Sequence, residues 1–231
     1  DRSLPSFESL VGHLEFTEDR LALRGLRARF LGGELQAQGD APGPGQLQIS
    51  AKGSIPAASL AQFHDPSFGP RLPARIGAAL SGALAFDARF ELHDRRSTLS
   101  IDSDLSGLAS TLPAPFGKRA DERSPLRIES ATSADGVETL RVHLRDDAQL
   151  VLERQRASGS AAAKLRRGAF ALGTDAVLPD AGFAARVHSP QLDLDAWDAL
   201  LDDTPPTAGS AVASSPPIAS DASSFVPDVV S

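Results

Sequence analysis

The sequence predicts an all-β protein: an elongated, curved antiparallel sheet, groove-like or taco-like in shape, with one or two short helices and a disordered C-terminal tail. Three observations predict this fold class. Apolar residues alternate with polar residues over long stretches, short polar turns separate these stretches, and few segments show helical spacing of apolar residues. Alternation places residues i and i+2 on one face of a strand. One apolar and one polar face are typical of an antiparallel sheet with a solvated side.

The longest alternating run spans residues 76–92. Its even positions are apolar or glycine, whereas polar residues accumulate at the odd positions. We expect one amphipathic strand over this whole run, which would extend over roughly 55 Å. This length is about three times that of an ordinary strand, and it favours an elongated sheet.

The same alternation recurs along the chain and predicts about ten to twelve strands in all. Clear examples lie at 26–30 and 47–55, where apolar residues alternate with Arg, Gln, Ser and Lys. Shorter matches are Leu14 with Phe16, Leu99 with Ile101, Leu126 with Ile128, Leu140 with Val142 and Leu144, Leu150 with Leu152, and Phe183 with Ala185 and Val187.

Short polar segments between these runs predict the hairpin turns of an antiparallel meander. They lie at 17–20, 31–33, 93–96 and 134–136. Two stretches rich in Pro and Gly punctuate the chain as well. Residues 39–45 predict a turn between strands, and the segment LPAPFGKR, residues 112–119, predicts a longer loop.

Two segments have helical character. Residues 57–63 are one candidate, and residues 195–201 are another, with Asp195 as the N-cap and Trp197, Leu200 and Leu201 on the apolar side.

We expect residues 1–203 to form one β-groove segment. Residues 204–231 are rich in Ala, Ser and Pro and contain no Lys or Arg. Such a composition buries too little apolar surface to offset the entropy of ordering, which predicts a disordered tail. The chain begins at Asp1 and contains no Met, so we expect a processed chain or an excised fragment.

Composition excludes several classes of function. The net charge of -7 with scattered basic residues disfavours nucleic acid as a partner. The absence of Cys excludes disulfides, thiolate metal sites and cysteine nucleophiles. No apolar run approaches the roughly 20 residues that span a bilayer, so a membrane anchor is expected outside this fragment.

Residues that could carry chemistry do not fall into catalytic patterns. The five histidines show no HxH, HxxxH or HExxH spacing; they are His13, His64, His93, His143 and His188. Asp102 with Asp104, and Asp193 with Asp195, are expected to share strand faces as solvated carboxylates. Neither a GxSxG elbow nor a P-loop is present. We therefore expect no enzyme, no metal site and no cofactor, although a hydrolase with residues assembled in three dimensions remains an alternative.

The apolar face is the remaining candidate site. It fits either the closed core of a β-sandwich that acts as a scaffold or protein-interaction module, or an open groove for acyl chains. Periodicity does not separate these two interpretations, and the length of the 76–92 run favours the groove. The expected groove lining is Leu47, Ile49, Ile76, Leu80, Leu84, Phe86, Phe90, Leu92, Leu99 and Ile101.

One central segment resembles a known family. Residues 100–128, SIDSDLSGLASTLPAPFGKRADERSPLRI, are similar to a segment of the YhdP branch of the AsmA-like envelope proteins. RRGAFALG at 166–173 and PQLDLDAWDALL at 190–201 resemble the same branch, whereas FTEDRLALRGLRARFLGGEL at 16–35 resembles a strand–turn–strand unit found more widely in AsmA-like proteins. The resemblance covers roughly residues 7 to 201.

The resemblance carries several expectations. Members of this branch are long periplasmic proteins that an N-terminal helix anchors in the inner membrane. Their repeated β units form a groove thought to carry phospholipid between the inner and outer membranes. The resemblance therefore implies phospholipid acyl chains as the ligand and both membranes as partners through other parts of the protein. It implies no catalytic residues, and it leaves open whether the LPAPFGK loop is a structural turn or a lipid gate.

Overall fold

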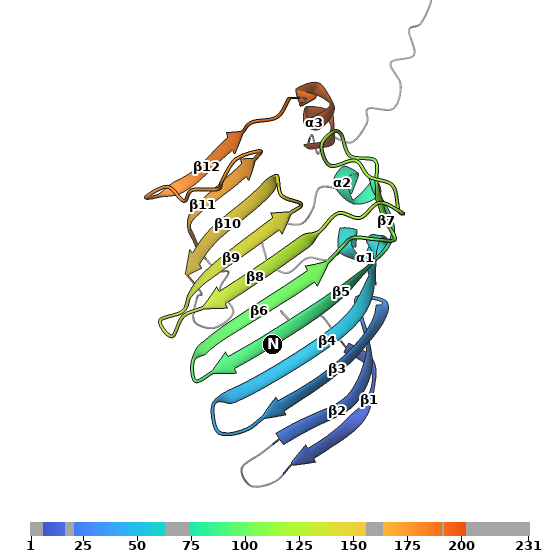
Figure 1. The fold of residues 1–231 in the computed structure, drawn as a ribbon, viewed down its shortest axis with the longest axis vertical. Helices are drawn as coiled ribbons and strands as arrows, with labels where there is room; N and C mark the ends of the chain where they lie inside the picture. Colours follow the sequence, from blue (N-terminus) through green and yellow to red (C-terminus); the bar gives the residue numbers. More distant parts are fainter. Residues whose placement is uncertain (1–6, 17–20, 63–73, 156–163, 191, 202–231) are drawn as a thin grey trace, which may run out of the picture.

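The chain folds as one open sheet of 12 strands with short helices along one edge (Figure 1). The structure is a computed structural model that describes residues 7–16, 21–62, 74–155, 164–190 and 192–201. The all-β class and the curved, open sheet are confirmed, with three short helices where one or two were expected. Within the described residues, all 12 strands belong to this sheet, and no second sheet faces it.

The sheet follows the chain order closely. Neighbouring strands are β1-β2-β3-β4-β5-β6-β8-β9-β10-β11-β12, and the short β7 pairs with β5. The strands are β1 (Phe7–Phe16), β2 (Leu21–Phe30), β3 (Gly33–Ala41), β4 (Gln46–Pro56), β5 (Leu80–His93), β6 (Arg96–Ser103), β7 (Leu108–Ser110), β8 (Leu126–Thr132), β9 (Val137–Leu144), β10 (Ala148–Gln155), β11 (Lys164–Leu172) and β12 (Gly182–Val187). The helices are α1 (Ala57–Gln62), α2 (Ala74–Ala78) and α3 (Leu194–Leu201).

The longest strand is shorter than its alternating pattern predicts. β5 begins at Leu80 and spans 14 residues, and residues 74–78 form helix α2 instead. The sequence IGAA at 76–79 contains no polar residue, so an apolar even position carries no period-2 information there. The first polar residue of the run is Ser81, directly after the first residue of β5.

Three predicted hairpin turns are confirmed. Leu31 and Gly32 connect β2 to β3 with positive φ angles of 49° and 75°, as a type I′ turn requires. Asp94 and Arg95 connect β5 to β6, since the pairing of the two strands continues up to His93 and Arg96.

The third turn connects β8 to β9 around Gly136, which has a φ of 80°. The turn predicted at 39–45 is shorter than expected, because β3 continues to Ala41 and residues 42–45 complete the connection. Gly39 pairs with Ile49 across the two strands, so it belongs to the ladder and not to the turn.

The sheet is antiparallel except at one end, where β12 lies parallel to β11. The expectation of a wholly antiparallel meander is wrong for this pair. Residues 173–181 between the two strands are too many for a tight hairpin and allow the chain to cross back to the start of β11. Part of this connection lies against β10, where Gln149 Oε1 accepts a hydrogen bond from the Ala176 amide at 3.2 Å.

Helix α1 is confirmed at the predicted position, and α3 differs in its cap. Asp193, not Asp195, is the N-cap, because Asp193 Oδ1 accepts a hydrogen bond from the Ala196 amide at 3.0 Å. Asp195 lies in the first turn of the helix. The prediction that Asp193 and Asp195 share a strand face is therefore wrong.

Some predictions fall outside the described residues: the turn at 17–20, Phe63, His64 and the tail at 204–231. The boundary at residue 203 consequently stays a prediction. Among the helices of the described residues, none is long and apolar enough to cross a membrane.

The buried core gathers at the edge of the sheet that carries the helices. Residues from α1, from β3 to β5 and from the segment around β7 make up the buried cluster of Leu35, Ile55, Ala57, Leu84, Phe86, Leu105 and Leu108. Figure 1 shows α1, α2, β7 and α3 along this edge, with the hairpin turns β5–β6 and β8–β9 at the opposite one. We call these the helical edge and the hairpin edge.

Candidate functional site

The strand register aligns the apolar residues into rows that cross the sheet. Ile49 pairs with Phe90, and Phe90 pairs with Leu99 on its other side. A second row joins Ala88, Ile101, Ile128, Val142, Leu150 and Phe170 in adjacent strands. Because side chains opposite each other in neighbouring strands point to the same face, these rows form one continuous apolar wall.

Six of the predicted lining residues belong to this wall. They are half-buried, and the register brings them together from β4, β5 and β6. They are Leu47, Ile49, Phe90, Leu92, Leu99 and Ile101. The wall extends further than predicted, since β8, β9, β10 and β11 add Ile128, Val142, Leu150 and Phe170 to the same face.

The other four predicted lining residues lie at the helical edge. Leu84 and Phe86 are each only 8% exposed, because the segment around β7 and helix α1 cover them. Leu80 packs against the same cluster. Ile76 lies on α2 and not on the sheet, for the reason given above. These side chains fill a core. Ile101 and Ala88 of the wall also pack against this core, so the wall begins directly beside it.

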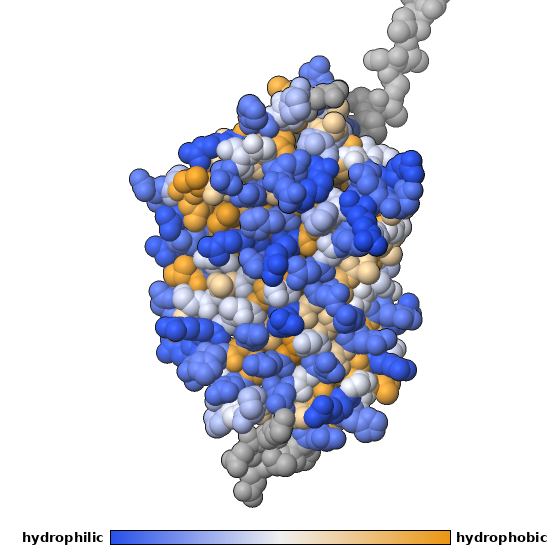
Figure 2. All heavy atoms as spheres, viewed as in Figure 1, coloured by the Kyte–Doolittle hydropathy of each residue, from blue (hydrophilic) through white to orange (hydrophobic). Residues whose placement is uncertain are grey.

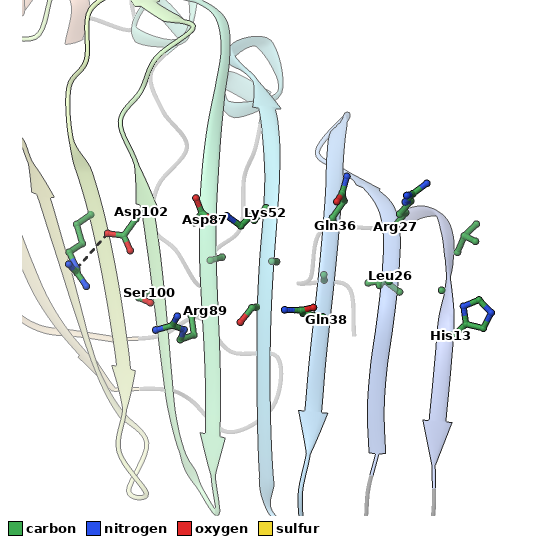
Figure 3. Close-up of a pocket in the computed structure, with 18 residues that line it drawn as sticks. His13, Leu26, Arg27, Gln36, Gln38, Lys52, Asp87, Arg89, Ser100 and Asp102 are labelled. Atoms are coloured by element: carbon green, nitrogen blue, oxygen red, sulfur yellow. Dashed lines mark ion pairs between the residues drawn. The ribbon is translucent and has the colours of Figure 1, made fainter.

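The opposite face of the sheet is polar, and Figure 2 shows it as mostly hydrophilic. It holds a shallow depression of about 780 Å³ that crosses the strands from β1 to β8, and Figure 3 shows its lining side chains. Lys52 pairs with Asp87 at 2.9 Å, and Arg127 approaches Asp102 at 3.7 Å. Charged and amide side chains such as Arg27 and Arg89 share its lining with Val11 and Leu26, so this hollow is of mixed polarity, unlike the apolar wall.

The segment that resembles the YhdP branch builds the helical edge. Ser103 Oγ donates to the Ala85 carbonyl at 2.6 Å and accepts from the Leu105 amide at 3.0 Å. These bonds turn the chain so that Leu105, with a φ of 52°, enters the core. Gly107 then approaches β5, and a Cβ on Gly82 would lie 2.1 Å from the Gly107 carbonyl oxygen.

Asp104 lies just beyond β6, and it does not share a strand face with Asp102 as predicted. Its Oδ1 accepts a hydrogen bond from the Ser106 amide at 3.0 Å. This backbone bond is the main reason that the pKa of Asp104 is lowered, with Arg123 contributing further. Asp104 therefore contacts the Ser106 backbone, whereas Asp102 lies near Arg127.

Lys118 connects the LPAPFGK loop to the segment around β7. Its ammonium donates to the carbonyls of Leu105 and Arg119, each at 2.9 Å, and also to the Leu108 carbonyl. The Lys118 backbone pairs with Ser110 through two further hydrogen bonds. These contacts account for a structural role of the loop.

Helix α3 docks on this loop. The Trp197 ring meets the Phe116 ring edge-on with centroids 5.5 Å apart, and the Trp197 indole nitrogen donates to the Ala114 carbonyl at 3.4 Å. Arg75 of α2 donates to the Ala199 carbonyl. The predicted apolar side of α3 is therefore correct for Trp197.

The described histidines are spread over β1, β5, β9 and the segment after β12. Within the described chain, no group of three or more His, Cys, Asp or Glu side chains is arranged to hold a metal ion.

The sequence analysis missed two charged residues, one on β9 and one on β10, that lie on the apolar face. Glu138 alternates with Leu140, Val142 and Leu144, and it pairs across the strands with Arg154. Arg154 Nη2 lies 3.1 Å from Glu138 Oε2. The sequence did contain a signal for them. Glu138 and Arg154 each stand an even number of residues from the wall residues of their own strand, which places them on the same face.

The fold is a single open, curved amphipathic sheet, filled at one edge and without a second described sheet over its apolar wall. The chain belongs to the YhdP family, described as YhdP protein, which matches residues 1–227. This family is a branch of the AsmA-like proteins, as the central segment indicated. The match extends beyond the resembling residues at both ends. No curated protein and no solved structure is significantly similar to the chain.

Proposed function

We propose that the chain is a segment of a periplasmic, inner-membrane-anchored lipid-transfer protein. Its apolar wall carries phospholipid acyl chains between the inner and outer membranes, and other parts of the protein contact the membranes. Membership of the YhdP family supports this role. The observation that carries it is the apolar wall itself: half-buried residues aligned across the strands without a second sheet over them in the described chain.

The composition of the wall suits transport. Burial of apolar surface stabilises a bound chain by about 25 cal/mol per Å², and this attraction has no preferred direction. Its central rows, through Ile49, Phe90 and Leu99 and through Ala88 and Ile101, are aliphatic or aromatic. An acyl chain can therefore slide from one strand to the next with little change in free energy. The proposed role needs no catalytic residue.

Site-specific photo-crosslinking in cells tests the proposal. Crosslinkers at Phe90 and Leu99 should capture phospholipid, because these residues pair on the apolar wall. Matched controls are Arg89 and Thr98, the exposed chain neighbours of the same two residues on the polar face. A crosslinker at Phe86 should capture less lipid than one at Phe90, because Phe86 is covered by the core.

Equal capture at Phe90 and Arg89 would contradict the proposal. Capture of a protein instead of lipid at Phe90 and Leu99 would favour the alternative of a scaffold or protein-interaction module.

A further inference from the structure

The outermost strand β12 exposes apolar side chains at one end of the sheet. Its register with β11 aligns Phe183, Ala185 and Val187 with the rows of the apolar face. Phe183 and Val187 are 55% and 49% exposed, whereas a wall residue of a central strand such as Phe90 is half-buried. The difference arises because β12 has a neighbour on one side only: among the described residues it pairs with β11 alone, and Figure 1 shows no strand beyond it.

The Phe183 ring shows which face these residues occupy. A Cβ atom on Gly168 of β11 would lie 2.7 Å from Phe183 Cδ2 and 2.9 Å from Leu152 Cδ2. The ring therefore lies over Gly168, on the side of the sheet that carries Leu152 of β10. The apolar face thus continues to the last strand and ends there with an exposed aromatic ring.

The two outer strands of the sheet differ in regularity. In β1, the register with β2 shifts between Glu8 and Val11 and again between Val11 and His13, and Ser9 has a φ of 53°. Such bulges twist an edge strand away from the geometry that a further strand needs. β12 pairs with β11 without a register shift, and it contains no Pro, no Lys and a single charged residue, Arg186. Of the two, β12 is therefore better suited to accept another strand.

The sequence of β12 suits antiparallel pairing with a second copy of itself. Ala185 stands midway between Phe183 and Val187. A two-fold axis at Ala185 places each Phe183 opposite the second copy's Val187, and an aromatic residue opposite a β-branched one is a favourable cross-strand pair. The same register sets Arg186 opposite Ala184, so the two cations do not face each other.

Other registers of this pairing are less favourable. An axis between two residues would join the apolar face of one copy to the polar face of the other, because side chains alternate along a strand. An axis at Arg186 would set two like charges directly opposite each other, which is destabilising. An axis at Ala184 would set Phe183 opposite Ala185 and lose the aromatic–β-branched pairs.

We propose that two copies of the chain associate through β12 about a two-fold axis at Ala185, so that their apolar walls join into one continuous wall. The contact is isologous, since each copy contributes the same strand. It is also small, because residues 183–187 are far fewer than the roughly 20–30 residues a side of a standard interface. The association is therefore reversible and depends on protein concentration. It goes beyond the lipid-carrying function proposed above and does not require lipid.

Single cysteines test the register, because the chain contains no Cys of its own. Residues directly opposite each other in antiparallel strands have Cα atoms about 4.5–5.5 Å apart, which is within the range of a disulfide. Ala185→Cys should therefore form a disulfide-linked dimer when the intact, purified protein is mildly oxidised. Non-reducing electrophoresis measures the linked fraction.

Two further cysteine variants are the matched controls. Ala184→Cys changes the neighbouring residue on the opposite face, which is offset along the strand from its own copy. Leu14→Cys lies on β1, at the other end of the sheet, and reports random collisions. Each should form about tenfold less linked dimer than Ala185→Cys, because the Cα atoms do not come within disulfide range.

Sedimentation equilibrium tests the association without a disulfide. The mass of the wild type should rise from monomer toward dimer as the protein concentration increases. Val187→Lys should weaken the dimer about tenfold, because symmetry removes two cross-strand pairs at once. Leu14→Lys, which changes an apolar residue of β1 that is 56% exposed, should leave the association unchanged. Circular dichroism confirms that both variants keep the sheet, and if Val187→Lys does not fold, the cysteine variants decide.

The outcomes that overturn the inference are distinct from those that overturn the proposed function. Linkage through Ala185→Cys no greater than through Leu14→Cys, or a wild-type mass that stays monomeric at every concentration, excludes the association. Preferential linkage through Ala184→Cys excludes the proposed axis. Lipid capture at Phe90 is a separate measurement, and it tests the lipid-carrying wall whether or not the dimer forms.

Discussion

The two edges of the apolar face differ in composition and in how they are filled. At the helical edge, Leu84 and Phe86 are covered by the segment around β7 and by α1, so this end is an ordinary protein core. At the hairpin edge, the same face ends in Glu138 and Arg154, which are charged yet largely shielded from water. Low exposure on this face therefore has two different causes, apolar packing at one edge and a shielded ion pair at the other.

The largest expected effect is on stability at the helical edge. Phe86→Ala should lower the free energy of unfolding by about 3–5 kcal/mol, because it leaves a cavity in the buried cluster. Phe90→Ala, two residues further along the same face, should cost about 1–2 kcal/mol, since Phe90 is only half-buried. Urea denaturation followed by circular dichroism measures both values, and equal losses would show that the two parts of β5 do not differ.

The ion pair at the hairpin edge provides the next test. Arg154→Met alone should destabilise the protein by about 3 kcal/mol, because it leaves the shielded Glu138 carboxylate without this charge partner. Adding Glu138→Leu should restore most of the stability. Lys52→Met should cost less than about 1 kcal/mol, because its pair with Asp87 is solvated. A double-mutant cycle from denaturation curves measures the coupling, and coupling as weak as that of Lys52 with Asp87 would contradict the contrast between the faces.

A smaller effect is expected in the loop that seals the helical edge. Lys118→Met should cost about 2 kcal/mol, because the ammonium donates charged hydrogen bonds to the carbonyls of Leu105, Leu108 and Arg119. Arg119→Met, a neighbouring exposed cation of the same loop, serves as the control. Amide hydrogen exchange at Leu108 and Ser110 should accelerate in the first variant only; unchanged exchange would rule out a closing role for Lys118.

The smallest effect concerns acid sensitivity on the polar face. The Arg167 guanidinium, bound to Glu153 at 2.7 Å, lowers the pKa of Glu153 below its ordinary value of 4.5. The ion pair therefore stabilises the folded protein fully above pH 4.5, and this stabilisation is lost as the pH falls through the lowered pKa of Glu153. Thermal melts should show a shallower acid dependence for Glu153→Gln than for the wild type; curves of the same slope would argue against this pair.

Much of the sheet is predictable because strand alternation is a local property. Phe90 and Leu99 are assigned correctly to one face from their own neighbours in sequence, and the turn at Asp94 places them side by side. Prediction fails at Ile76, where only apolar residues and glycine are present and helix and strand look alike. It also fails at β12, whose parallel pairing with β11 depends on how residues 173–181 cross the sheet.

The sequence by itself determined which residues share a face, because the pleat of a strand sets this within a few residues. The sequence also identified the family, because the segment that builds the helical edge resembles it. Only the tertiary structure decided which part of the apolar face is a filled core and which part is a wall, because burial depends on distant segments such as Leu105 and α1. The same holds for Glu138 and Arg154, which the register of β9 with β10 brings into contact on the apolar side.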